Sequence, residues 1–225
     1  MILVLFDIDG TILLSGGAAV RAVNRAFSNI YGVENAMDGI RADGKTDPMI
    51  LGEIFNKRLG RDFTREEASR VFNEYVFFLR EEITNSEGFR IMPGVPELLN
   101  VLTQRMDLVL GVATGNIQQG AQIKLERAGL DSNFKFGGFG SDSEDRGKLI
   151  RVAVERGEKV VNHNREFENF FVIGDTPFDI VHGRAAGGKT VAVATGSYSV
   201  DDLAEYSPDY LFENFSDFQA VLKIF

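Results

Sequence analysis

Four short apolar runs place the main constraint on how this chain can fold. Each is rich in Val, Ile, Leu or Phe, and they occupy residues 1–6, 108–113, 170–173 and 190–194. Runs of this length are typical of strands that are buried on both faces. Helical patterns lie between them, and those over residues 119–128 and 147–156 each precede a glycine that we expect to end the helix. The alternation predicts an α/β fold, a Rossmann-like three-layer core with a parallel sheet.

The segment from residue 15 to residue 87 interrupts this alternation. It shows no convincing strand pattern, and its apolar residues recur at helical spacing. The Asp-Pro pair beginning at Asp47 predicts a helix with this aspartate as N-cap, and Thr64 begins the spacing of a capping box. We therefore predict two domains, a Rossmann-like core formed by residues 1–14 and 88–225 and an inserted all-helical domain formed by residues 15–87.

Composition excludes several classes of function. The 225 residues carry a net charge of −9 and no cysteine. The charge argues against a nucleic-acid partner, and the absence of cysteine excludes disulfides, thiolate catalysis and Cys-ligated zinc. No apolar run approaches the roughly 18 residues of a membrane helix, and the N-terminus lacks a signal-peptide pattern. We expect a cytoplasmic protein with no membrane partner, either a monomer or a homodimer.

Two acidic clusters follow apolar runs directly. Asp7 and Asp9 come after the first run, and Asp175 and Asp179 come after the third. Ligands of parallel sheets bind at the carboxyl ends of the strands, where these aspartates are expected. Neighbouring carboxylates resist ionising together unless a cation lies between them, and hard oxygen ligands suit Mg²⁺. The alternative is that these aspartates only cap turns and helices, but two such clusters together favour the metal site.

Two weaker signals involve candidate phosphate contacts. Thr114, Gly115 and Asn116 end the second run, where a hydroxyl and exposed amides at a helix start can hold a phosphate. Lys148 stands near the start of a helix, which is unfavourable against the helix dipole unless an anion is nearby. A plain N-cap and a solvated lysine are the structural alternatives, and Arg146 competes with Lys148 for the phosphate.

Together, in this order, these motifs resemble those of the haloacid dehalogenase superfamily. Asp7 to Thr11 resembles its first motif, Thr114 its second, Lys148 its third, and Gly174 to Asp179 its fourth. The resemblance covers essentially the whole chain and implies that residues 15–87 form a mobile helical cap. The chain is most similar to the phosphoglycolate phosphatase-like members.

The resemblance also implies a mechanism, that of a Mg²⁺-dependent phosphatase acting on a small-molecule phosphate monoester. Asp7 would form a phosphoaspartate, and Asp9 would act as general acid and base. Thr114, Gly115, Asn116 and Lys148 would bind the substrate. Asp7, Asp175 and the backbone carbonyl of Asp9 would bind the metal, with Asp179 supporting them.

Two other functions remain open at this point. A sugar phosphomutase of the same family would share the phosphoaspartate, although no histidine occurs in residues 18–30, where such enzymes usually carry one. A catalytically weak regulatory module could use the same fold without turnover. The retention of both Asp7 and Asp9 argues against that module.

Overall fold

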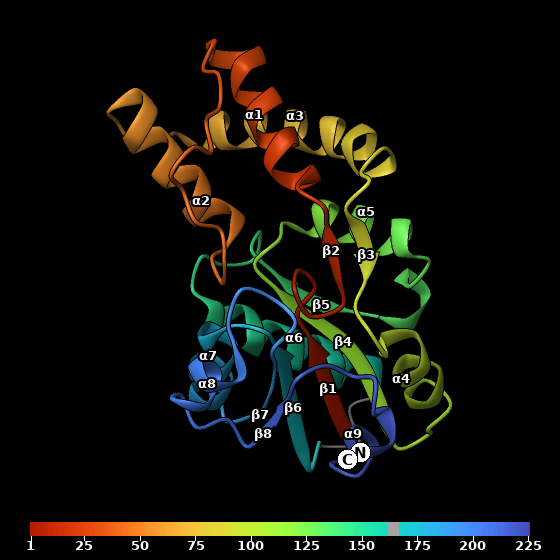
Figure 1. Ribbon diagram of the computed structural model, residues 1–225. Coiled ribbons are helices and arrows are strands. Elements are labelled where there is room, and N and C mark those ends of the chain that lie inside the picture. Colours follow the sequence, from red (N-terminus) through yellow and green to blue (C-terminus); the bar gives the residue numbers. More distant parts are fainter. Residues whose placement is uncertain (162–166) are drawn as a thin grey trace.

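A six-stranded parallel sheet forms the centre of the molecule. The computed structural model describes residues 1–161 and 167–225, and it confirms the predicted α/β core (Figure 1). The strand order is β5-β4-β1-β6-β7-β8, and each neighbouring pair is parallel. The strands are β1 (Ile2–Phe6), β4 (Leu108–Thr114), β5 (Gly137–Phe139), β6 (Asn169–Gly174), β7 (Lys189–Val193) and β8 (Tyr210–Phe212).

Helices cover both faces of this sheet. Successive side chains of a strand point to opposite faces, so Val4 and Phe6 join one apolar cluster while Leu3 and Leu5 join another. The first cluster holds side chains of α4 (Val95–Leu102), α5 (Gln118–Ala128) and α9 (Phe218–Leu222). On the opposite face lie α6 (Arg146–Val160), α7 (Pro177–Ala185) and α8 (Val200–Ala204). The core therefore has the three layers that the sequence predicts. A short 3₁₀ turn, Asp131–Asn133, follows α5.

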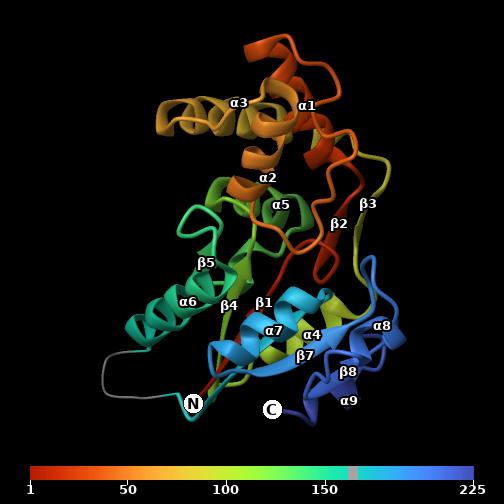
Figure 2. The ribbon, with the colours of Figure 1, turned by 90° about the vertical axis from the view of Figure 1, so that its left-hand side faces the viewer.

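Residues 15–87, which we call the helical insertion, lie beyond the carboxyl ends of β1 and β4 (Figures 1 and 2). They contain α1 (Ala18–Tyr31), α2 (Asp47–Ile54), a π-helical turn (Phe55–Leu59) and α3 (Arg65–Thr84). The three helices bury an apolar cluster of their own, built around Phe27, Leu51 and Phe55. A second cluster joins α1 and α3 to α5 of the core. The insertion thus packs directly on the core.

A short antiparallel ribbon that the sequence did not predict connects the insertion to the core. It pairs β2 (Leu13–Ser15) with β3 (Phe89–Ile91). Gly16 follows β2 with φ of +61°, and a Cβ atom there would lie 2.4 Å from the carbonyl carbon of Gly88. The two chain crossings between core and insertion therefore lie side by side, and only glycine fits at Gly16.

Local predictions of helix ends had mixed outcomes. The capping box at Thr64 is confirmed, and Gly129 ends α5 in the left-handed conformation. Gly157 does not end its helix, because α6 continues to Val160. Asp47 is not the N-cap of α2, since the Thr46 hydroxyl accepts the capping hydrogen bond and Asp47 is the first helical residue.

No helix in the described part of the chain has the length and apolar character needed to cross a membrane.

Candidate active site

Asp7 is placed by the central strand of the sheet. It directly follows β1, and its amide donates a hydrogen bond of 2.8 Å to the carbonyl oxygen of Ile173 in β6. The chain then turns at Gly10, whose φ is +84°, and a Cβ atom there would lie 2.3 Å from Oδ2 of Asp175. Glycine at this position lets the loop after β1 pass directly beside the second acidic cluster.

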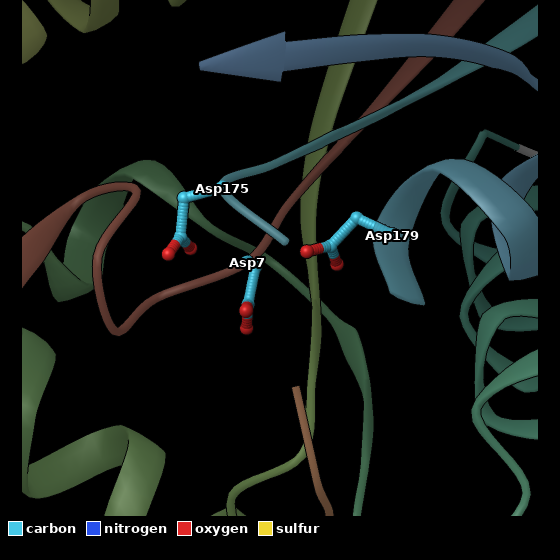
Figure 3. Close-up of side chains that lie close together, drawn as sticks. All are labelled: Asp7, Asp175 and Asp179. Carbon is cyan, nitrogen blue, oxygen red and sulfur yellow. The ribbon is translucent and has the colours of Figure 1, made fainter. Parts of the chain in front are cut away.

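Asp7, Asp175 and Asp179 come together at this end of the sheet (Figure 3). Asp7 follows β1, Asp175 follows β6, and Asp179 lies in the first turn of α7. One carboxylate oxygen from each residue lies within 4.8 Å of the others. All three are buried. Burial raises the pKa of Asp7 to about 6 and that of Asp175 well above its ordinary value, while the hydroxyl of Thr11, which donates to Asp175, opposes the second shift.

Arg146 provides the positive charge beside these acids. It begins α6, its side chain is only 4% exposed, and Nη2 lies 2.9 Å from Oδ2 of Asp7 and 2.5 Å from Oδ1 of Asp179. Nη1 donates to the carbonyl oxygen of Gly44 in the helical insertion. The two carboxylates raise the pKa of Arg146 further above its already high value, so the guanidinium is permanently charged. The guanidinium thus pairs with two of the three clustered carboxylates, and this excess of hard oxygen donors fits a divalent cation.

Lys148 is not brought to this site. Its side chain is exposed and does not line the cavity described below, whereas its backbone amide donates to the N-cap carboxylate of Asp145. Arg146 and Lys148 are the first and third residues of α6, and at 100° per residue they point to nearly opposite sides of the helix. Of the two cations that the sequence left in competition, Arg146 contacts the acidic cluster.

A second charged group surrounds Asp9. Nζ of Lys124, from α5, lies 2.6 Å from Oδ2 of Asp9 and 2.6 Å from Oδ1 of Asn116. The amide of Asn116 donates to the same Asp9 oxygen at 2.7 Å and to the hydroxyl of Thr114 at 2.8 Å. Lys124 is 3% exposed, but the Asp9 side chain is 38% exposed. One oxygen of Asp9 is therefore fixed by two donors from a buried network, and the carboxylate still borders the cavity.

The helical insertion contacts this second group through Asp47. Its backbone amide donates to the carbonyl oxygen of Gly115 at 2.8 Å, and its carboxylate accepts from the amide of Ile117 at 2.7 Å. A Cβ atom on Gly115 would lie 2.2 Å from the carbonyl oxygen of Lys45, so glycine is needed for this close approach. Burial raises the pKa of Asp47 to about 6, although the positive charge of Lys124 opposes the shift.

One cavity of about 430 Å³ joins these groups. Asp7, Asp9, Thr114, Arg146 and Asp175 line its core side, and side chains of α1, α2 and α3 line the other side. Gly115 and Asn116 line it as well. The structure therefore brings together every site residue predicted from the sequence except Lys148.

Comparison with known proteins identifies the family. The sequence profile described as haloacid dehalogenase-like hydrolase matches residues 4–193. The chain belongs to the haloacid dehalogenase-like hydrolase family. It is therefore an enzyme of a hydrolase family, as the motifs predict.

Relatives of this hydrolase cover nearly its whole length. It is 25% identical over 228 residues to a phosphoglycolate phosphatase of Haemophilus influenzae, covering 96% of each chain. It is 28% identical over 220 residues to the pyrophosphatase PpaX of Listeria welshimeri, covering 97% of this chain and 95% of the other. A solved hydrolase structure from Pseudomonas syringae aligns with a TM-score of 0.72 at 23% identity, covering 98% and 97% of the two chains, and shows the same fold.

Lys124 at the site of this hydrolase was not predicted from the sequence, and neither were the contacts of Asp47 with the core. Lys124 lies on the same face of α5 as Ala121, Leu125 and Ala128, the face that packs on the core. A lysine on an otherwise apolar helix face is a sequence pattern that could have indicated its role. Asp47 was predicted to be a helix N-cap in a Gly-rich turn that could face the site, but its partners in the core were not predicted. Its contact with the segment after Thr114 joins residues far apart in the sequence, and no local pattern predicts it.

Proposed function

We propose that this hydrolase is a Mg²⁺-dependent phosphatase that cleaves phosphate monoesters of small molecules, with Asp7 as the nucleophile. The observation that carries the proposal is the position of Asp7, buried at the end of the central strand, paired with Arg146 and bordering the same cavity as Asp9. A phosphoryl group in this cavity would have a nucleophile, a permanent positive charge and a proton donor around it. The phosphatase names of the relatives support the same reaction class.

In the first step, a carboxylate oxygen of Asp7 attacks phosphorus and forms a new P–O bond while the bond to the leaving oxygen breaks. Asp9 gives its proton to that oxygen, so the product leaves as an alcohol. Arg146 and Thr114 hold the non-bridging oxygens, where negative charge is concentrated. Gly115 and Asn116 complete this side of the substrate site.

In the second step, a water molecule attacks the phosphorus of the phosphoaspartate. Asp9, now a carboxylate, takes a proton from the water, the P–O bond to Asp7 breaks, and inorganic phosphate leaves. Lys124 and Asn116 hold one oxygen of Asp9 throughout, which keeps the other free to exchange a proton with the reacting groups. Lys124 is thus a positioning residue.

The donor set beside Asp7 fits Mg²⁺, and we propose that Asp7, Asp175 and the backbone carbonyl of Asp9 hold it. When bound, the ion supplies positive charge to the phosphoryl oxygens. Asp179 is paired with Arg146 and orients it, because two nitrogens of the guanidinium donate to its Oδ1. We further propose that residues 15–87 act as a cap domain over a catalytic core formed by residues 1–14 and 88–225.

Phosphate release from p-nitrophenyl phosphate tests the reaction class. We expect turnover with Mg²⁺, loss of turnover with EDTA, and loss in Asp7→Asn. The matched control is Asp142→Asn, because Asp142 pairs with Arg156 outside the cavity. A folded wild type that releases no phosphate under these conditions would contradict the proposal, and release that persists in Asp7→Asn would contradict the role of Asp7.

A further inference from the structure

The insertion side of the cavity is lined mostly by apolar side chains, which does not suit binding of a second anionic group. Each helix of the insertion contributes apolar side chains to it, among them Val20 and Val23 of α1, Ile50 of α2 and Phe72 of α3. Ligand sites of about this size are usually apolar with a few polar groups that fix orientation. The hydroxyl-bearing ring of Tyr75 also lines this side.

The charged residues on this side are already engaged or are acidic. Nζ of Lys45 lies 2.5 Å from Oε1 of Glu53, so this lysine already has an ion-pair partner within the insertion. Asp43 accepts a hydrogen bond from Ser197, and Asp47 accepts one from the amide of Ile117. A second carboxylate on a substrate would therefore meet two acids and one paired lysine here.

The other cationic side chains that line the cavity do not belong to the insertion. Arg146 and Lys124 are bound to the acids of the core side, as described above. Arg90 lies on β3, outside the insertion, and is exposed. Burying an anion costs free energy unless a partner of opposite charge is present. Among the insertion residues that line the cavity, the one cation is Lys45, which is already paired with Glu53.

We infer that the leaving group of the natural substrate is an uncharged alcohol with an aliphatic or aromatic body, which packs against the apolar side chains of α1, α2 and α3. This inference rests on the proposed phosphatase function and adds the substrate class. It separates this chain from an enzyme for phosphoglycolate, whose leaving group carries a carboxylate.

A series of straight-chain alkyl phosphates tests the inference. Ethyl, butyl and hexyl phosphate have leaving groups of similar chemical reactivity, so differences in kcat/KM report mainly on binding of the chain. Each methylene that becomes buried should raise kcat/KM roughly fourfold. Butyl phosphate should exceed its analogue with a terminal carboxylate by roughly tenfold or more. A flat series, or a carboxylate analogue that is the better substrate, would overturn the inference.

A matched pair of variants assigns the effect to the cavity. Val20 lines it and is 41% exposed, while Val181 on α7 is 46% exposed and does not line it. We expect Val20→Lys to flatten the alkyl series and to improve the carboxylate analogue severalfold, and Val181→Lys to leave both unchanged. If Val20→Lys leaves the chain-length dependence unchanged, the inference is wrong.

The proposed function and this inference fail in different ways. If no ester, including p-nitrophenyl phosphate, releases phosphate in an Asp7-dependent manner, the proposed function fails. If p-nitrophenyl phosphate is cleaved with Asp7 dependence but the alkyl series is flat, the phosphatase function stands and only the apolar leaving group is overturned.

Discussion

The two sides of the cavity differ in kind. On the core side, Asp7, Asp9 and Arg146 have ionisable side chains that are held by short hydrogen bonds and ion pairs. On the insertion side, most lining side chains are apolar, as with Val23 and Phe72. The segment after β1 and the start of α6 hold the first set in place, and the packing of three helices forms the second. Under the proposed function, reaction chemistry and substrate choice would be built by separate parts of this chain, and variants on each side can test that division.

The largest expected effect is on the core side. Asp7→Asn removes the proposed nucleophile while keeping the shape of the side chain, so kcat should fall at least about 10³-fold for every ester. The loss should be the same for alkyl and aryl phosphates, because no contact on the insertion side changes. Steady-state kinetics on two unlike esters, with urea denaturation to verify folding, make the measurement. A loss confined to one ester would contradict the division between chemistry and substrate choice.

The second effect concerns the cation of the core side. Arg146→Met should lower kcat roughly 10²-fold, because the positive charge beside the proposed phosphoryl site is lost. Lys148→Met should leave kcat within about twofold of wild type, since that side chain lies outside the cavity. Metal-saturated kinetics of both variants, together with their unfolding midpoints, make the comparison. A strong loss in Lys148→Met with an intact Arg146→Met would reverse the assignment.

This pair of residues shows where sequence reasoning reaches its limit. The acids were predictable, because Asp7 and Asp175 follow apolar strands and parallel strands end at one edge. The choice between Arg146 and Lys148 depends on the rotational phase of α6, and helix boundaries are uncertain by one or two residues from sequence. A shift of two residues turns a side chain by about 200°. The local pattern therefore fixes the presence of a cation but not its identity.

The insertion side was less predictable for a different reason. The sequence predicts helices there, and the capping box at Thr64 is confirmed. The cavity wall, however, arises only when α1, α2 and α3 meet over the core. The same apolar periodicity would describe helices with fully packed faces. Long-range packing, rather than local propensity, decides which apolar residues remain at a cavity.

Asp47 lies where the two sides meet, and it yields a prediction about stability. Burial raises its pKa from 3.8 to about 6, so the folded state binds this proton more tightly than the unfolded state. This tighter proton binding contributes fully to the free energy of unfolding at pH values below 3.8, the pKa in the unfolded state. The contribution is lost as pH rises through about 6, the pKa in the folded state. It amounts to at most roughly 3 kcal/mol.

Asp47→Asn removes this titration, so the variant should gain stability relative to wild type as pH rises from about 4 to about 7. The Asn oxygen can still accept the hydrogen bond from Ile117. Urea denaturation at several pH values makes the measurement, with Asp38→Asn as the control because Asp38 is an exposed aspartate of the same insertion. If the wild type and Asp47→Asn curves run parallel with pH, the carboxyl is not perturbed as described.

The smallest expected effect is that of Lys124→Met, and it tests whether Lys124 positions Asp9. Lys124→Met keeps a side chain of similar length but releases the Asp9 oxygen that Lys124 holds. If Asp9 protonates the leaving oxygen as proposed, its positioning matters most when the leaving group is a poor one. We expect kcat for butyl phosphate to fall about 30-fold but kcat for p-nitrophenyl phosphate to fall only about threefold. Lys159→Met, on the exposed side of α6, should change neither rate. Equal losses on both esters would mean that Lys124 acts only by holding the fold together, since a purely structural defect does not distinguish between leaving groups.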